Sequence, residues 1–428
     1  MTYKSLGNLA ASLLLAVAAV GSNPAAADVP KISGQEELLY AWTLGTEGLG
    51  DGSDKLVTID ARPGSPTYGK VISTVSVGGR HEAHHAGISE DLKFLWASGL
   101  DDSAIYIFDI HTDPANPKLI KTITDFEEVS GGVVGSHSIH GVPGGNMMIS
   151  GLSNKDRGGR TALVEYTADS EYVATYWMPT PDDMQGAEGK EVADGYGYAV
   201  AVLPRRNVML TSSFTGWSNY MRDFGDLVQD EEAMKRFGQT MVIWDLKKRQ
   251  PRKVMKVPGA PLEIRWGRQP GHDYAFAAAA LTSKLWLIYE DANGEWQAEN
   301  VAHIGDPTTG SMPVDMTLSL DDKSLWVTTF ADGTTRLFDV SNPHDPKEVY
   351  SKKIGTQVNM VVQSWDGERI YFTSSLLSKW DKKEAENEHF IKLYKWDGKE
   401  LKHEFTVDFV KEELGRPHDM KFGTVSTP

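Results

Sequence analysis

The segments FDIHTDPANPK (108–118) and FDVSNPHDPKE (338–348) are two copies of one pattern, although they lie far apart in the chain. Each copy ends a β-strand, passes through a proline-containing turn and leads into a second strand. Strand–turn–strand units of this kind recur seven times, at 56–75, 105–123, 161–178, 241–257, 285–304, 335–354 and 390–407. Self-similarity at this spacing indicates a repeat architecture.

A second kind of hairpin precedes most of these units. Examples are GISEDLKFLWASGL (87–100), GVPGGNMMISGL (141–152), VLPRRNVMLTSSF (202–214), LSLDDKSLWVTTF (318–330) and QSWDGERIYFTSSL (363–376). Two hairpins in succession supply four strands, which is one blade of a β-propeller. The sequence therefore predicts an all-β, seven-bladed β-propeller. The first unit lacks a preceding hairpin, so we expect the C-terminal RPHDMKFGTV (416–425) to provide its innermost strand and close the ring.

The N-terminal residues 1–27 have the features of a signal peptide. Lys4 precedes an apolar run (9–20) that is too short to span a bilayer, and Ala25-Ala26-Ala27 gives a cleavage signal. We expect a single propeller domain over 28–428, delivered to the periplasm of a Gram-negative cell without a membrane anchor after cleavage.

Two stretches interrupt the repeat, at 179–195 and 217–239. The second has helical composition between residues 226 and 237. Such insertions on a repeat fold form either a lid over a site or surface decoration. The sequence leaves both interpretations open.

Charge and cysteine content exclude several classes of function. The formal net charge is −16, which argues against nucleic acid or an anionic membrane surface as a partner. The chain has no cysteine, so disulfides, thiolate metal ligands and a cysteine nucleophile are all excluded.

Five histidines lie at equivalent places before or within the inner hairpins: His84, His85, His137, His140 and His418. Innermost strands of a propeller line its central channel, so these side chains are expected to converge on one metal site. Imidazole ligands without sulfur suit copper, zinc, iron or nickel, and the affinity order favours copper. The alternative is that each histidine is a structural residue of its strand.

Two carboxylates occupy similar channel positions in other blades. They are Glu263 in PLEIRW and Asp315 in MPVDMTL, and Asp315 corresponds to His85 when the two hairpins are superimposed. Glu82 and Asp419 are sequence neighbours of the histidines. Each carboxylate could orient an imidazole or accept a proton. The alternative is an ion pair with an arginine such as Arg265.

The residues His81-Glu82-Ala83-His84-His85 also satisfy the zinc-protease pattern H-E-x-x-H. That chemistry needs both histidines on one face of a helix. Glycines and strand patterns surround this segment, so we reject the protease interpretation.

From about residue 40 to the C-terminus, the chain resembles the selenium-binding protein family, which includes the bacterial methanethiol oxidases. The resemblance rests on EAHHAG, HSIHGVPGGNMMISGL, APLEIRWGRQP, YFTSSLLSKWDKK and RPHDMKF, in this order. It implies a seven-bladed propeller that uses copper and O2 to oxidise a small thiol, methanethiol, to formaldehyde, hydrogen sulfide and hydrogen peroxide. The family's histidines match His84, His85, His137, His140 and His418, and its carboxylates match Glu82, Glu263 and Asp315. A homo-oligomer is left open.

The chain departs from the family at two places. Gly69 replaces the cysteine associated with selenium, and Asp332-Gly333-Thr334 replaces a His-Gly-Asp found in many relatives. Two rival functions follow from the fold. One is a non-enzymatic periplasmic propeller that binds metal or a partner protein. The other is a metal-dependent lactonase or hydrolase, which would favour carboxylate and asparagine ligands over histidine.

Overall fold

The computed structural model describes residues 36–154, 160–180, 192–306 and 308–423. The predicted signal peptide (1–27) and most of the predicted insertion 179–195 lie outside these residues. All of the described residues belong to one compact unit. Within the described part of the chain, no helix is long and apolar enough to cross a membrane.

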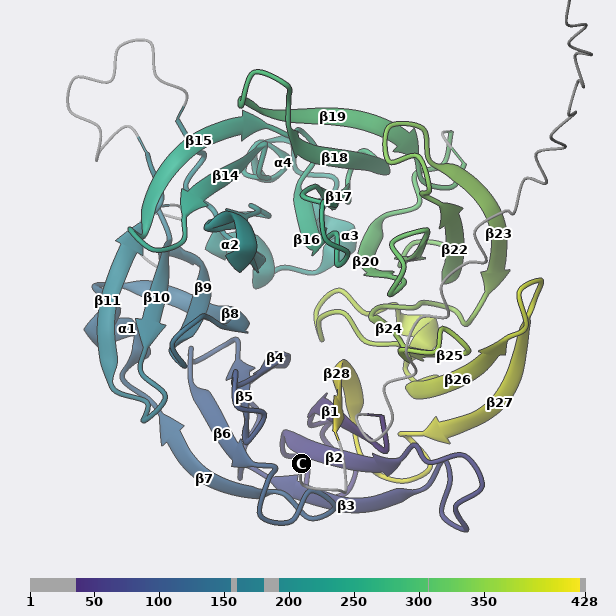
Figure 1. Ribbon diagram of the computed structural model, residues 1–428. Helices are drawn as coiled ribbons and strands as arrows, with labels where there is room; N and C mark the ends of the chain where they lie inside the picture. The colour runs from purple at the N-terminus through teal and green to yellow at the C-terminus, as the bar shows by residue number, and fades with distance from the viewer. Residues whose placement is uncertain (1–35, 155–159, 181–191, 307, 424–428) are drawn as a thin grey trace, which may run out of the picture. The chain divides into compact units, whose positions relative to one another are not determined.

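The described residues form seven four-stranded sheets that surround a central channel as blades (Figure 1). Blade 1 consists of β28 (Arg416–Gly423), β1 (Leu38–Leu44), β2 (Lys55–Asp60) and β3 (Val71–Ser76). Blade 2 consists of β4 (Ala83–Ile88), β5 (Phe94–Gly99), β6 (Ile105–Asp109) and β7 (Lys118–Ile123). Blade 3 consists of β8 (Val133–Gly141), β9 (Met147–Asn154), β10 (Ala162–Tyr166) and β11 (Tyr172–Trp177). Blade 4 consists of β12 (Val200–Leu203), β13 (Val208–Thr211), β14 (Thr240–Asp245) and β15 (Gln250–Lys256).

The remaining blades repeat this order from the channel outward. Blade 5 consists of β16 (Pro261–Trp266), β17 (Ala275–Ala279), β18 (Lys284–Glu290) and β19 (Trp296–His303). Blade 6 consists of β20 (Pro313–Leu318), β21 (Ser324–Thr329), β22 (Thr334–Asp339) and β23 (Lys347–Lys353). Blade 7 consists of β24 (Val361–Gln363), β25 (Arg369–Thr373), β26 (Phe390–Trp396) and β27 (Leu401–Asp408). The predicted seven-bladed propeller is confirmed.

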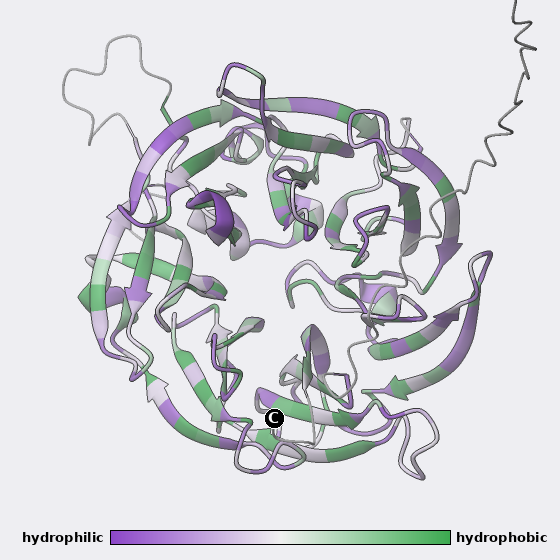
Figure 2. Cartoon of the chain, in the orientation of Figure 1, coloured by the Kyte–Doolittle hydropathy of each residue, from purple (hydrophilic) through white to green (hydrophobic). Residues whose placement is uncertain are grey.

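The ring closes as predicted, because β28 is the innermost strand of blade 1 and pairs with β1, Met420 opposite Ala41. Strand β1 itself was not predicted. All seven of its residues are buried, so LLYAWTL lacks the alternation that marks a half-exposed strand. Outer strands such as β7 do alternate, and Figure 2 shows hydrophobic and hydrophilic residues interspersed along them.

The insertion 217–239, which we call the cap, contains α2 (Trp217–Tyr220), α3 (Phe224–Leu227) and α4 (Glu231–Met234). These helices are short because Asp223 and Asp230 each accept backbone N–H groups and start a new helix. Tyr220 and Phe237 join a buried cluster that includes Trp380 of blade 7. The cap is therefore part of the core. The other short helices are α1 (Phe126–Ser130), η2 (Pro204–Arg206) and η3 (Lys383–Ala385).

Candidate metal centre

Three innermost strands carry a β-bulge where their histidines lie. β4 bulges between Ala83 and Ala86, and β8 bulges between Ser136 and Ile139. In β28 the bulge falls at His418. A bulge adds an unpaired residue to the strand and redirects its side chain. The inserted residues of these three strands include all the predicted histidines except His140.

The strands on the opposite side of the channel bulge at the same level. β16 bulges between Pro261 and Ile264, and β20 bulges between Pro313 and Asp315. By this register Glu263 and Asp315 both correspond to His85, as the sequence predicted for Asp315. Carboxylates therefore face histidines across the channel.

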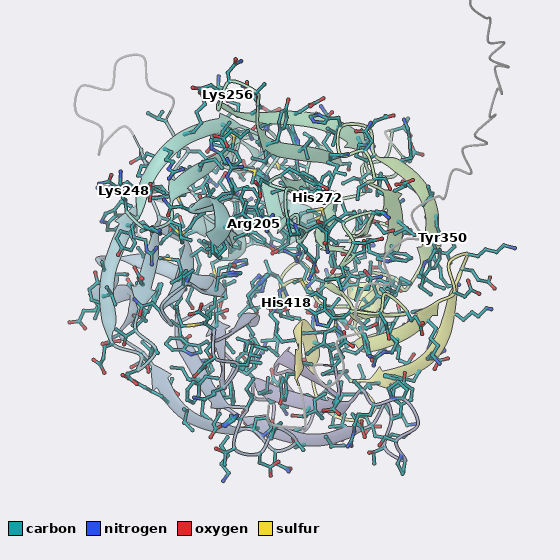
Figure 3. The ribbon with its side chains drawn as sticks, in the orientation of Figure 1. Arg205, Lys248, Lys256, His272, Tyr350 and His418 are labelled. Atoms are coloured by element: carbon teal, nitrogen blue, oxygen red, sulfur yellow. The ribbon has the colours of Figure 1, made fainter. Side chains whose placement is uncertain are left out.

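Four of the predicted histidines form one buried cluster, which we call the histidine centre: His84, His85, His137 and His418. The ring of His84 lies 3.8 Å from that of His418 and 4.8 Å from that of His137, measured between centroids. The rings of His85 and His137 are 4.1 Å apart. None of the four residues is more than 5% exposed. His418 lies in the middle of the ring of blades in Figure 3.

Each of these imidazoles has one buried nitrogen that finds no hydrogen-bond partner among the described residues. These atoms are Nδ1 of His84 and Nε2 of His85, His137 and His418. One nitrogen each from His84, His85 and His137 lies within 4.8 Å of the other two. Burying a polar atom without a hydrogen-bond partner costs free energy. Several such nitrogens close to one point therefore indicate a bound ion. The four-imidazole set fits a transition metal of the copper, zinc, iron or nickel group.

Burial lowers the pKa of all four imidazoles, and that of His418 falls to about 4. The rings are therefore neutral at neutral pH. A metal-binding imidazole must be neutral, so the site needs no deprotonation before it binds an ion.

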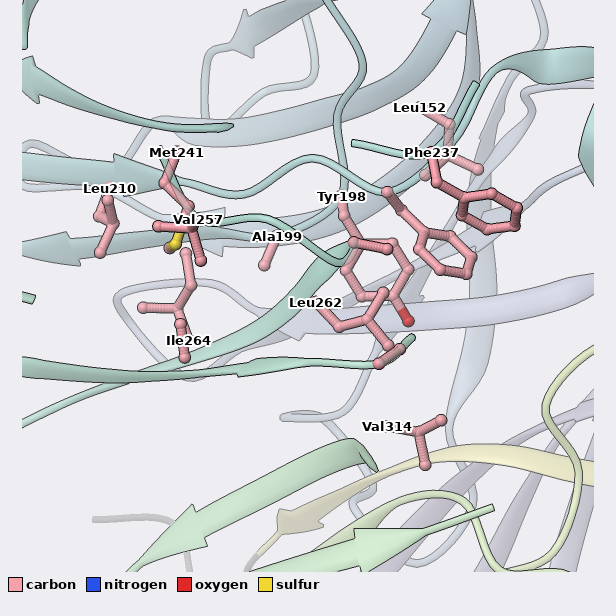
Figure 4. Close-up of a cluster of buried hydrophobic side chains, with 14 of the residues drawn as sticks. Leu152, Tyr198, Ala199, Leu210, Phe237, Met241, Val257, Leu262, Ile264 and Val314 are labelled. Atoms are coloured by element: carbon pink, nitrogen blue, oxygen red, sulfur yellow. The ribbon is translucent and has the colours of Figure 1, made fainter. Parts of the chain in front are cut away.

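Tyr198 supports the centre from the cap side, and the sequence analysis missed it. Its carbonyl oxygen lies 3.0 Å from Nδ1 of His137, and its ring centroid is 4.1 Å from that of His137. Tyr198 packs in the buried cluster that contains Leu262 and Val314 (Figure 4). An apolar core therefore backs the centre on this side. The sequence signal that could have revealed Tyr198 is its position just before the innermost strand β12. His84 and His85 likewise lie at the start of the innermost strand β4.

The two predicted carboxylates differ in how their oxygens are used. Glu263 accepts a hydrogen bond from Nη1 of Arg265 at 2.8 Å through Oε2, while no described residue bonds to its buried Oε1. Asp315 accepts from Nη2 of Arg265 through Oδ1 and from the amide of Val361 at 2.8 Å through Oδ2. Burial raises the pKa of Asp315 to about 7. The alternative of arginine pairing thus holds for both, but Glu263 keeps one free oxygen.

The structure does not bring His140 into the histidine centre. The close ring contacts among the described residues join the other four histidines and leave His140 out. The bulge of β8 ends at Ile139, so His140 lies further along the strand, half-buried. Burial and two nearby cations, Lys421 and Arg265, lower its pKa to about 4.

A cavity of about 720 Å³ reaches the centre along the channel, and its lining includes His85, His140, Glu263, Arg265 and Lys421. The cavity extends to the turns that join innermost to second strands, where Pro204 and Arg205 of blade 4 line it. The cap leaves blade 4 from the other end of β13. A ligand in this cavity therefore approaches His85 from the face opposite the cap.

The acidic residues next to the histidines in the sequence, Asp419 and Glu82, hold the surrounding backbone in place through hydrogen bonds. Asp419 accepts the amide of Ala86 at 2.8 Å and pairs with Lys421. Glu82 accepts the amide of Ser378 at 2.7 Å, and burial raises its pKa to about 7.

The remaining sequence candidates lie outside the centre. His81 bonds to Asp102 through Nδ1 at 2.6 Å, and it precedes a strand rather than lying on a helix, as expected. Asp332 is held in a turn by Arg336 at 2.6 Å. Gly69 has φ +75°, and a Cβ there would lie 2.8 Å from the ring of Phe405, so a side chain at this position would be strained.

Fold and site together define a seven-bladed β-propeller with a buried histidine centre in its channel. This chain belongs to the selenium-binding protein family: the family described as 56kDa selenium binding protein (SBP56) matches residues 22–426.

Two bacterial relatives are similar over most of their length. A methanethiol oxidase of Ruegeria pomeroyi is 62% identical over 399 residues, covering 92% of this chain and 91% of the relative. A methanethiol oxidase of a Hyphomicrobium species is 56% identical over 394 residues, covering 92% and 88%. A hypothetical selenium-binding protein from Sulfolobus tokodaii has the same fold, with TM-score 0.78 and 24% identity over 94% of this chain and 96% of that one.

Proposed function

We propose that this protein is a periplasmic, copper-dependent oxidoreductase that converts methanethiol, O2 and water to formaldehyde, hydrogen sulfide and hydrogen peroxide. The observation that carries the proposal is the convergence of four buried imidazoles, each with an unpartnered nitrogen. The names of the two bacterial relatives support the reaction. The signal-peptide pattern in residues 1–27 supports the compartment.

Copper is the ion that best fits both the protein and the substrate. His84, His85, His137 and His418 would hold it, and imidazole is a good ligand for copper. A bound copper ion would attract the soft sulfur of a thiolate and exchange single electrons with O2.

The residues around the centre would prepare the thiol for oxidation. The cavity admits a small molecule to the side of the centre where His85 and Glu263 lie. The free Oε1 of Glu263 would accept the thiol proton, because Arg265 already holds Oε2 in place. Tyr198, Leu262 and Val314 would exclude water from the cap side.

The test uses mature protein purified from a periplasm, with its copper content measured. Copper-loaded protein should consume O2 with methanethiol and release sulfide and peroxide, and metal-free protein should not. His84→Ala should lose both copper and activity, while His403→Ala, an exposed histidine bonded to Thr406, should retain them. Copper-loaded protein without turnover would leave a metal-binding propeller, and activity without O2 would indicate a hydrolase.

A further inference from the structure

A second cavity, of about 320 Å³, lies beside the channel cavity, and we call it the apolar pocket. Leu92, Leu320 and Trp365 in its lining come from turns that join innermost to second strands, so it lies on the face opposite the cap. The lining that it shares with the channel cavity includes Leu92, Leu318 and Arg268. A cavity of this volume suits a small molecule, and the proposed function gives it no role.

The lining of the pocket is mostly apolar and comes from four blades. Blade 1 contributes Tyr40 and Phe422, blade 2 Leu92, blade 6 Leu318 and blade 7 Trp365. The side chain of Leu92 is 53% exposed, which is unusual for a large apolar residue beside a cavity. A ligand with an apolar body would cover this surface and remove it from water.

Arg268 is the only cationic side chain among the described residues that line the pocket. It follows β16 of blade 5, and its amide donates to both carboxylate oxygens of Asp322, at 2.8 and 2.9 Å. Its guanidinium carbon lies over Trp365, 5.0 Å from the ring centroid. Trp365 is held in turn by Glu36, which accepts its amide. The guanidinium is therefore positioned at the pocket before any ligand arrives.

Arg268 also differs from the other arginines and lysines that line the two cavities, because no described carboxylate forms an ion pair with it. The other three form ion pairs: Arg265 with Glu263 and Asp315, Arg205 with Asp273, and Lys421 with Asp419. Asp322 is already bonded to the amides of Arg268 and Gln269 and to His272. Partial desolvation and the charge of Arg265 lower the pKa of Arg268. The pocket thus holds a cation that an anion would stabilise.

We propose that the apolar pocket binds a small organic monoanion, a carboxylate or sulfonate with an apolar body. The charged group pairs with Arg268, whose planar donors match two oxygens of such a group. The apolar body covers Leu92, Leu318 and Trp365. A neutral molecule would leave Arg268 without a partner, and an inorganic anion would leave the apolar side chains in water.

An occupant of the pocket would narrow the route to His85, because the pocket and the channel cavity share lining residues. The entry of a thiol would then depend on the concentration of a second, anionic molecule. This consequence rests on the proposed function, whereas the binding of the anion does not.

The test measures binding to the mature protein at pH 7 by isothermal titration calorimetry, with octanoate as the probe. Octanoate should bind with a negative heat-capacity change, because its chain leaves water. Octanamide lacks the charge and acetate lacks the apolar chain. Both should therefore bind at least about 10-fold more weakly than octanoate.

Arg268→Gln should weaken octanoate binding by about 10- to 100-fold and leave octanamide binding unchanged. The control is Arg206→Gln, which removes a positive charge from the same face. Arg206 pairs with Asp273 and Glu290 and lines neither cavity, so this variant should keep the octanoate affinity. Leu92→Asp keeps the test decisive if Arg268→Gln does not fold. Aspartate tolerates the φ of +61° at this position, and its charge should repel octanoate.

Octanoate that fails to bind at millimolar concentrations, or that binds Arg268→Gln and Leu92→Asp as tightly as the unchanged protein, would overturn the proposal. So would binding seen only after residues 424–428 are removed, since the chain's own C-terminus would then be the occupant. In copper-loaded protein, octanoate should also raise the KM for methanethiol. Octanoate binding in a protein without turnover would refute the proposed function alone, and a KM that ignores octanoate would refute the narrowing of the channel.

Discussion

Oε1 of Glu263 lies 3.8 Å from Nε2 of His85, and both atoms are buried without a hydrogen-bond partner among the described residues. Every other oxygen of the Glu263–Arg265–Asp315 network is bonded. A free carboxylate oxygen beside a free imidazole nitrogen is where a thiol proton would be taken up. The two carboxylates that the sequence placed together are therefore expected to have different roles.

Glu263→Gln should lower kcat for methanethiol by about 100- to 10,000-fold, because the amide cannot accept the proton. Asp315→Asn should lower kcat less, since both Asp315 oxygens are already bonded to Arg265 and Val361. Its main effect should be on stability. Oxygen uptake and urea unfolding of both variants check this order. A larger kcat loss in Asp315→Asn would assign the proton to Asp315 instead.

Gly135→Ala should destabilise the protein by roughly 2 kcal/mol or more, because φ is +66° and the added Cβ would lie 2.7 Å from the ring of Trp217 in the cap. Gly310→Ala is the matched control, with φ +67° and no heavy atom of the described part of the chain within 4 Å of the new Cβ. Both variants carry the cost of a side chain at positive φ, but only Gly135→Ala carries the clash with Trp217. The difference between their thermal unfolding therefore measures the clash. Equal losses would show that the cap does not press on β8.

Sequence patterns captured the parts of this protein that repeat. The turns after Asp109 and Asp339 identified the hairpins, and the missing hairpin before the first unit identified the closing strand. The bulges could not be predicted, because strict alternation would direct His84 and His85 to opposite faces of β4. The bulge of β8 is also what places His137 in the centre and His140 outside it. The sequence alone does not show the bulge, so it could not distinguish these two histidines.

Two supporting residues also escaped the sequence analysis. Tyr198 and Asn359 contact the centre through one carbonyl and one amide, contacts that depend on how neighbouring blades meet. A buried tyrosine or asparagine in a propeller is ordinarily explained by packing. Their role follows only from the three-dimensional arrangement.

The metal-free protein should lose stability as the pH falls from about 6.5 towards 4. Burial lowers the pKa of His418 to about 4 in the folded protein, whereas the unfolded chain takes up the proton near 6.5. Between these values the unfolded state binds more protons, so acid favours unfolding. His418→Gln should show a shallower decline between pH 7 and 5 in urea unfolding experiments. An identical slope would mean that His418 is not neutral in the folded protein.

A repeated aspartate ends the third strand of several blades, and it should stabilise each following turn only while ionised. Asp60 accepts from Arg62 at 2.8 Å and from Ser65 at 2.6 Å, and these bonds hold its pKa below the ordinary value of 3.8 despite its burial. Asp109 ends β6 in the same way and bonds to Thr112 at 2.6 Å, and no arginine among the described residues pairs with it.

Asp60→Asn should therefore cost about 1.5–3 kcal/mol at pH 7, and Asp109→Asn should cost less. For a carboxylate whose pKa is lowered by folding, this stability is present above 3.8 and is lost as the pH falls through the folded value. The deficit of Asp60→Asn relative to the unchanged protein should begin to shrink below about pH 4, because the unfolded chain then takes up a proton that the folded aspartate does not, and it should go on shrinking as the pH falls towards the folded value. Urea unfolding at pH 7 and at about pH 3.5 measures both deficits. A deficit that stays constant across this range would show that shape, rather than charge, is what Asp60 contributes to the turn.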